Sequence, residues 1–142
     1  MKNNNKRNKS QKKISNGAAV EKNDESRHKM ILCVNERLNM GMGKIAAQCC
    51  HAAVGCYKTA KQQSAKALHK WEKSGSPQIA LKCPDEEEMD YIASKAQEYD
   101  IPVYFVTDAG RTEVAAGSRT VLGLGPAPEH VVDKITSHLK LL

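Results

Sequence analysis

The sequence predicts an α/β fold: a single three-layer domain over residues 29–142, in which a mixed four-stranded sheet carries helices on both faces. Four short apolar runs of strand length are separated by longer patterns of helical period. Their order is strand, helix, helix, strand, helix, strand, strand, helix, which is typical of layered α/β domains. A chain of 142 residues, 40% of them hydrophobic, can bury one modest core, so a second domain is not expected.

The expected strands are residues 29–34, 77–83, 101–108 and 120–125. Because helical patterns separate the first three runs, their connections favour parallel pairing among these strands. The link between Val106 and Thr120 holds no helical pattern, so the fourth strand is expected to run antiparallel to a neighbour. Helices are expected at residues 43–60, 64–73, 85–100 and 128–142, the third with three glutamates where the helix dipole favours acids.

Residues 1–28 are expected to form a disordered basic tail, because they are rich in Lys, Asn and Ser and offer little apolar surface to bury. Residues 1–29 hold nine Lys or Arg and three acids, whereas residues 30–142 hold thirteen of each, so the net charge of +6 lies in residues 1–29, that is, in the tail and the first residue of the domain. Such a tail is compatible with nucleic-acid binding and equally with a solvated leader. No apolar stretch suits a membrane span or a secretory signal, so a soluble cytoplasmic protein is expected, with a mitochondrial location less favoured.

The segment 39–44 contains Gly41 and Gly43 at the start of the first expected helix. Glycines let a ligand approach the backbone, and the free N–H groups of a helix start suit an anion. A turn that needs glycine for its own geometry is an equally good explanation. A nucleotide-binding P-loop is excluded, because Ile45 rather than Ser or Thr follows Lys44.

Three polar side chains of the first expected helix, Lys44, Gln48 and His51, are spaced so that they share one face. They could bind, donate and accept in one direction. The alternative is a plain solvent-facing stripe, because Lys58 and Gln62 continue the same pattern.

Asp108 ends the third expected strand and is followed by Ala109 and Gly110, whose small size would let a substrate come close. Sites in α/β sheets gather beyond the carboxyl ends of strands, and segment 39–44 falls at such an end too. Capping of the following turn is the alternative role for an Asp before Gly. The same loop adds hydroxyls and phosphate-type donors, namely Arg111, Thr112, Arg119 and Thr120.

Metal and thiol chemistry are not expected. The five cysteines form no C-x-x-C pair and are interpreted as reduced core residues. Cys49, Cys50 and His51 are consecutive, so on a helix they point in different directions and cannot share a metal or act as a nucleophile pair. One Trp and one Phe offer little support for stacking on bases.

Three blocks, MGMGKIAAQCCHAAV, DAGRTEVAAGSRT and TVLGLGPAPEHVVDKITSHLKLL, closely resemble the type 2 peptidyl-tRNA hydrolases of archaea and eukaryotes, from Lys29 to Leu142. The resemblance implies hydrolysis of the peptidyl-tRNA ester, with no cofactor, no metal and a homodimeric state. It also implies a catalytic set and a substrate-binding set of residues. The catalytic set is Lys44, Asp108, Thr112 and Thr120, and the substrate-binding set is Gln48 and His51, to which the loop positions described above add Gly41, Gly43 and Arg111.

Two assignments of the catalytic roles stay open. Asp108 could activate or orient a water while Lys44 stabilises the developing oxyanion, or a neutral Lys44 could be the base. The chain also departs from the family pattern: Asn35, Glu36, Arg37, Asn39 and Met42 stand where the family has a more basic segment. The lost charges motivate an alternative function, a weakly active or inactive relative that serves as an RNA-binding or protein-interaction module, whereas the intact Lys44 and Asp108 oppose it.

Overall fold

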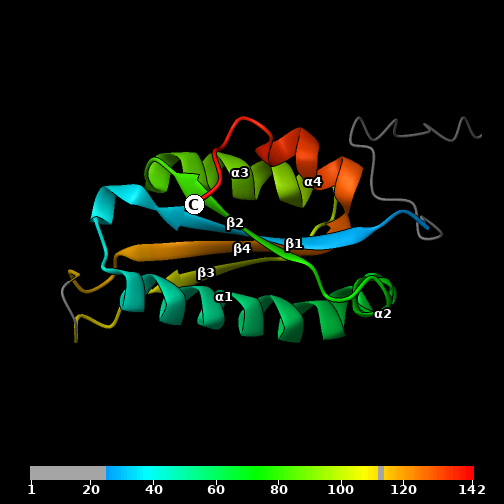
Figure 1. Cartoon of the computed structure of the whole chain (residues 1–142), viewed down its shortest axis with the longest axis horizontal. Coiled ribbons are helices and arrows are strands. Elements are labelled where there is room, and N and C mark those ends of the chain that lie inside the picture. The colour runs from blue at the N-terminus through cyan, green and yellow to red at the C-terminus, as the bar shows by residue number, and fades with distance from the viewer. Residues whose placement is uncertain (1–24, 112–113) are drawn as a thin grey trace, which may run out of the picture.

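The computed structural model describes residues 25–111 and 114–142. Residues 1–24 of the expected basic tail lie outside this part, so the tail stays a prediction. The elements in chain order are β1 (His28–Asn35), the short 3-10 helix η1 (Glu36–Leu38), α1 (Met42–Gln63), α2 (Ala65–Lys73), β2 (Gln78–Cys83), α3 (Glu86–Glu98), β3 (Val103–Thr107), β4 (Arg119–Pro128) and α4 (Glu129–Thr136) (Figure 1).

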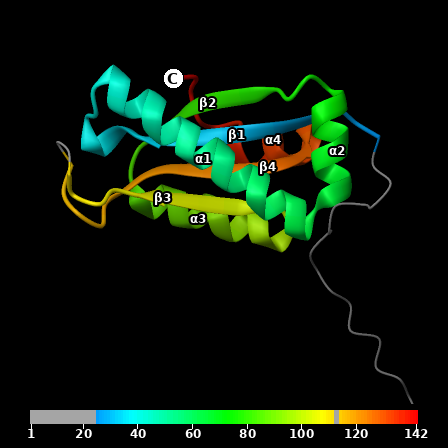
Figure 2. The ribbon, with the colours of Figure 1, turned by 90° about the horizontal axis from the view of Figure 1, so that it is seen from below.

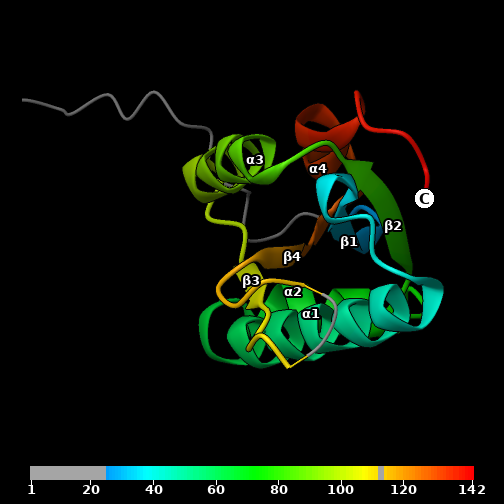
Figure 3. The same ribbon diagram turned by 90° about the vertical axis from the view of Figure 1, so that its left-hand side faces the viewer.

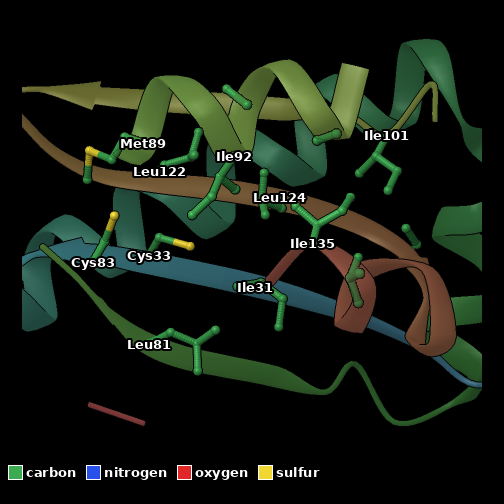
Figure 4. Close-up of a cluster of buried hydrophobic side chains, with 14 of the residues drawn as sticks. Ile31, Cys33, Leu81, Cys83, Met89, Ile92, Ile101, Leu122, Leu124 and Ile135 are labelled. Carbon is green, nitrogen blue, oxygen red and sulfur yellow. The ribbon is translucent and has the colours of Figure 1, made fainter. Parts of the chain in front are cut away.

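Three layers stack in the order α3 and α4, sheet, α1 and α2, as the end-on view in Figure 3 shows. This confirms the expected α/β fold with helices on both faces. One apolar cluster fills the space between the sheet and α3 with α4, and includes Ile31, Met89 and Leu122 (Figure 4). A second cluster lies between the sheet and α1 with α2, and includes Met30, Trp71 and Val121.

The sheet has the strand order β2-β1-β4-β3. β1 and β2 pair in parallel, as expected, and β4 runs antiparallel to both of its neighbours. The expectation of parallel pairing is wrong for β3, because the apolar strand β4 inserts between β1 and β3. β1, β2 and β3 nevertheless run in the same direction, so their carboxyl ends lie at one edge of the sheet (Figure 2).

The end of the chain differs from the expected helix over residues 128–142. β4 continues to Pro128, and α4 stops at Thr136. The last residues turn back along the outer edge of β2, where Lys82 N donates to Lys140 O at 2.8 Å and Leu142 N donates to Ala80 O at 3.1 Å. These backbone hydrogen bonds to an otherwise unpaired strand edge explain why the helix does not continue.

The helix α1 lies close against β4 at Gly123. A Cβ atom built on Gly123 would come 2.4 Å from Cys56 Sγ, so this position has no room for a side chain. Burial raises the pKa of the Cys56 thiol to about 12. Cys33, Cys56 and Cys83 are buried free thiols, as expected for core cysteines, but Cys50 is exposed on the outer face of α1 and does not belong to the core.

Candidate functional site

An ion pair joins the first turn of α1 to the end of β3. Lys44 Nζ lies 3.1 Å from Asp108 Oδ2, and the side chains are 15% and 3% exposed. The two residues are 64 positions apart in the chain, yet both follow the carboxyl ends of strands that run in the same direction. The sequence-based expectation that these two segments meet is therefore confirmed by the distance.

The carboxylate of Asp108 is fixed by its own loop. The backbone N–H of Asp108 donates to Ser118 O at 2.8 Å, and Asp108 O accepts from Gly117 N at 2.9 Å. Gly110 N donates to Asp108 Oδ1 at 3.2 Å, so one carboxylate oxygen holds the turn while the other faces Lys44. The geometry shows the turn-capping contact, and it leaves the second carboxylate oxygen facing Lys44 as a site role would require.

Gly110 is required by this turn. Its φ of 78° lies in the left-handed region, and a Cβ atom there would come 2.7 Å from Ala116 Cβ. Any larger residue would be strained and would also push the loop apart. Gly110 is thus required by the backbone conformation of the turn, independently of any role in substrate access.

A second polar contact lies one helical turn after Lys44. Gln48 Nε2 donates to Thr120 Oγ1 at 2.8 Å, and Thr120 Oγ1 lies 3.3 Å from Val106 O, to which it donates. Gln48 is 5% exposed and Thr120 is fully buried. This chain of hydrogen bonds ties α1 to β4 and β3 beside the ion pair, so both halves of the site are held at fixed positions.

The remaining expected site residues are more exposed. Gly41 is the N-cap of α1, and a Cβ atom built on Gly43 meets nothing within 4 Å. His51 and Arg111 are exposed. Thr112 lies outside the described residues, so its expected role stays a prediction.

The polar stripe of α1 divides between the two explanations left open by the sequence. Lys44 and Gln48 are directed into the protein, where they meet Asp108 and Thr120. Lys58 and Gln62, further along the helix, are exposed. The stripe therefore contacts polar groups of the strands at its amino-terminal end and faces solvent at its other end.

Arg119 does not join the donors expected in the loop after β3. Its guanidinium pairs with Glu86 and Asp90 of α3, at 3.4 Å from Nε to Glu86 Oε2 and 3.0 Å from Nη2 to Asp90 Oδ2, and it stacks on Phe105. Successive side chains of a strand face opposite sides, so Thr120 faces α1 and Arg119 faces α3. The i, i+4 spacing of Glu86 and Asp90 is the signal that could have indicated this in the sequence.

Two residues of the segment that departs from the family pattern have clear structural positions. Asn35 is buried, donates to Arg119 O at 3.0 Å and caps η1 by accepting from Arg37 N at 3.1 Å. Met42 is 88% exposed at the start of α1. An apolar side chain therefore projects into solvent beside the site.

Within residues 25–111 and 114–142, no three His, Cys, Asp or Glu side chains are grouped so that they could hold a metal ion. Burial raises the pKa of Cys49, the opposite of what a reactive thiolate needs.

Within the same described residues, no helix is long and apolar enough to cross a membrane. The groups that the site does bring together are an amine, a carboxylate, an amide and a hydroxyl, which suit proton transfer and stabilisation of an anionic intermediate.

Comparison with known proteins shows which family the chain resembles. The model of the family described as peptidyl-tRNA hydrolase PTH2 matches residues 28–142. The chain is 47% identical over 118 residues to the human protein named peptidyl-tRNA hydrolase 2, mitochondrial, an overlap of 83% of this chain and 66% of the human one. It is 46% identical over 119 residues to peptidyl-tRNA hydrolase 2 of Saccharomyces cerevisiae, covering 80% and 57%.

An archaeal relative is matched along nearly its whole length. The peptidyl-tRNA hydrolase of Sulfurisphaera tokodaii is 42% identical over 118 residues, which are 80% of this chain and 98% of that protein. The matched part therefore covers nearly all of the archaeal protein, but it spans two thirds or less of the human and yeast relatives.

Proposed function

Since the chain belongs to the type 2 peptidyl-tRNA hydrolase family, we propose that it hydrolyses the ester bond between a peptide and tRNA. The products are a free peptide and a tRNA that can be charged again after premature release from the ribosome. The observation that carries this proposal is the ion pair between Lys44 Nζ and Asp108 Oδ2, 3.1 Å long and close to the surface on the Lys44 side.

The proposed reaction adds water to the ester carbonyl and releases the terminal ribose oxygen of the tRNA. Asp108 orients or deprotonates the water, and Lys44 stabilises the negative charge that develops on the carbonyl oxygen. The low exposure of Asp108, 3% for its side chain, strengthens the electrostatic effect of the neighbouring amine. The released ribose oxygen takes the proton that the water gives up.

The other proposed site residues position the substrate. Gln48 and Thr120 hold the wall of the site beside the ion pair, through the 2.8 Å hydrogen bond between their side chains. The exposed Gly41, Gly43 and His51 would border the terminal adenosine. Thr112 and Arg111 complete the proposed set from the loop after β3, Thr112 as a catalytic residue.

Activity measurements on purified variants test this proposal. With an N-blocked aminoacyl-tRNA as substrate and no metal added, Asp108→Asn and Lys44→Met are expected to lower kcat/KM by at least about 100-fold. The matched control is Lys134→Met, because Lys134 is an exposed lysine of α4 on the opposite face. Wild-type protein that binds tRNA without turnover would instead support the alternative of a binding module.

Lys44→Arg separates the two open roles. Arginine keeps the positive charge but cannot act as a base, because its guanidinium stays protonated. If Lys44 stabilises the oxyanion, Lys44→Arg should retain part of the activity that Lys44→Met loses. Equal loss in both variants, with an unchanged fold by circular dichroism, would favour Lys44 as the base.

Four further properties belong to the proposal. The resemblance supports a homodimer, which light scattering on the pure protein would test. The boundary between the basic tail and the domain at residues 28 and 29, the cytoplasmic location, and the absence of any cofactor or metal are proposed on the sequence pattern. Fluorescent tagging of the full chain at its carboxyl end tests the location, since the human relative is named mitochondrial.

A further inference from the structure

The two helical layers carry opposite charge. α1 and α2 contain six lysines and a single acid, Glu72, whereas α3 and α4 contain seven acids and two lysines. The layers lie on opposite faces of the sheet (Figure 3). Residues 30–142 have equal numbers of basic and acidic residues, so the even balance of the sequence conceals a strongly polarised domain.

The positive layer is also the less neutralised one. Four of its lysines are exposed, and within the described part of the chain none of the four forms an ion pair: Lys58, Lys61, Lys66 and Lys73. On the other face, Glu86 and Asp90 pair with Arg119, and Glu88 accepts from His138 at 2.6 Å. The unpaired positive charge therefore gathers on the side of the sheet where Lys44 meets Asp108.

We propose that the outer surface of α1 and α2 binds the phosphate backbone of the tRNA acceptor stem, with Lys58 and Lys61 as its principal contacts. The inference rests on the proposed function for the identity of the nucleic acid. Lysines bind phosphates as point charges and read no base sequence, which suits a protein that must accept many tRNAs.

The spacing along α1 supports this arrangement. Lys58 and Lys61 follow Lys44 by 14 and 17 residues, which places them about 21 Å and about 25 Å further along the helix axis at 1.5 Å per residue. The single-stranded 3′ end of a tRNA separates its ester from the double-stranded stem. With the ester at Lys44, phosphates of the stem would thus lie over the distal half of α1.

Between these points α1 carries no acidic side chain, and its exposed residues there include Val54 and Tyr57. Ala46, Ala47 and Cys50 are exposed on the outer face of α1, and each has a small side chain. Glu72 is the one acid of the layer. Its negative charge and its hydrogen bond raise the pKa of the Tyr57 hydroxyl, so the Glu72 carboxylate lies beside Tyr57 at the junction of α1 and α2.

Binding measurements on the full chain test the inference without requiring catalysis. Deacylated tRNA is titrated at several salt concentrations against the wild type, Lys58→Gln/Lys61→Gln and the matched control Lys134→Gln/Lys140→Gln. The slope of log Kd against log salt should shrink by about 2 in the first variant, roughly 0.9 for each lost phosphate contact, and stay unchanged in the control. Glu72→Gln has the opposite charge effect and should tighten tRNA binding.

Kinetics separate the stem from the site. Lys58→Gln/Lys61→Gln should raise KM for an N-blocked aminoacyl-tRNA about tenfold or more at 0.1 M salt, with little change in kcat. It should leave the hydrolysis of N-blocked aminoacyl-adenosine unchanged, because that substrate ends before α1 reaches Lys58. Wild-type salt slope and KM in this variant would overturn the inference, even if hydrolysis is observed. Lysine-dependent tRNA binding without any hydrolysis would overturn the proposed function and leave this surface standing.

Discussion

The amide of Gln48 donates to the hydroxyl of Thr120 across 2.8 Å, and this contact lies between a helix and a strand that are 72 residues apart in the chain. Both side chains are nearly inaccessible to solvent, so a water molecule cannot substitute for either hydrogen-bond partner. The contact sets the distance between α1, which carries Lys44, and the strands that lead to Asp108. It therefore connects the stability of the fold to the geometry of the site.

Thr120→Val should lower the free energy of unfolding by about 1–3 kcal/mol, because the Gln48 amide loses its acceptor while the shape of the side chain is kept. Urea denaturation measures the change. Combining it with Gln48→Leu should cost less than the sum of the single changes, since the orphaned amide is then removed as well. Strict additivity would show that the two side chains do not stabilise each other.

Gly43 and Gly123 should respond in opposite ways to replacement by alanine. At Gly43 the added methyl meets nothing within 4 Å and lies in a helix, so thermal stability should stay unchanged or rise by up to about 1 kcal/mol. At Gly123 it meets Cys56 Sγ at 2.4 Å and Ala52 O at 3.2 Å, so a loss of about 1–3 kcal/mol is expected.

Gly43→Ala also tests the substrate path. If the terminal adenosine passes over Gly43, Gly43→Ala should raise KM for an N-blocked aminoacyl-tRNA in a protein that is fully folded. An unchanged KM would remove Gly43 from the proposed substrate-binding set.

Cys56 should make stability depend on pH in the alkaline range. Burial raises its pKa to about 12 in the folded protein, whereas a thiol in the unfolded chain has a pKa of roughly 8.5. The unfolded state therefore loses its proton first as the pH rises. The stabilising contribution is complete below about pH 8.5 and declines up to about pH 12, with a slope of at most about 1.4 kcal/mol per pH unit.

Comparison of the wild type with Cys56→Ala isolates this effect from the titration of other groups. Urea denaturation between pH 8 and 10.5 should give a shallower decline for Cys56→Ala, and an unchanged decline for Cys50→Ala, whose thiol is exposed. Parallel curves for all three proteins would contradict a buried neutral thiol at position 56.

The sequence predicts most of the fold because the signals for its strands and helices lie within short segments of the chain. Apolar runs indicate the strands, and polar spacing on one helix face singles out Lys44 and Gln48. The meeting of Lys44 with Asp108 was predictable because strands that run in one direction end at the same edge of a sheet. Most of the fold, and the contact between Lys44 and Asp108, could thus be predicted without knowing which strands pair with one another.

The features that the sequence did not predict depend on distant partners. β1 and β4 are the two most completely buried strands, and they take the two central positions of the sheet. Arg119 is drawn away from the site by Glu86, which is 33 residues earlier in the chain. The last residues leave the helical path because β2 offers an unpaired edge to Lys140 and Leu142. Each outcome is a competition between contacts that no short window of sequence contains.

Arg111 lies in the loop after β3 and Arg119 is the first residue of β4, and their replacement by glutamine should have different effects. Arg119→Gln removes the ion pairs with Glu86 and Asp90, so Tm should fall by a few degrees at pH 7. Arg111 is exposed and belongs to the proposed substrate-binding set, so Arg111→Gln should weaken tRNA binding and leave Tm unchanged. Calorimetry and tRNA titration on both variants measure the contrast.

The stability loss in Arg119→Gln should itself depend on pH. The hydrogen bond and the charge of Arg119 lower the pKa of Asp90 below its ordinary value of roughly 3.9. Because the folded pKa is the lower one, the contribution is present above that ordinary value and is lost as the pH falls through the folded pKa. The Tm difference between Arg119→Gln and the wild type should therefore shrink below about pH 4. A difference that stays constant from pH 7 down to pH 2 would mean that the stacking of Arg119 on Phe105, rather than its ion pairs, stabilises the loop.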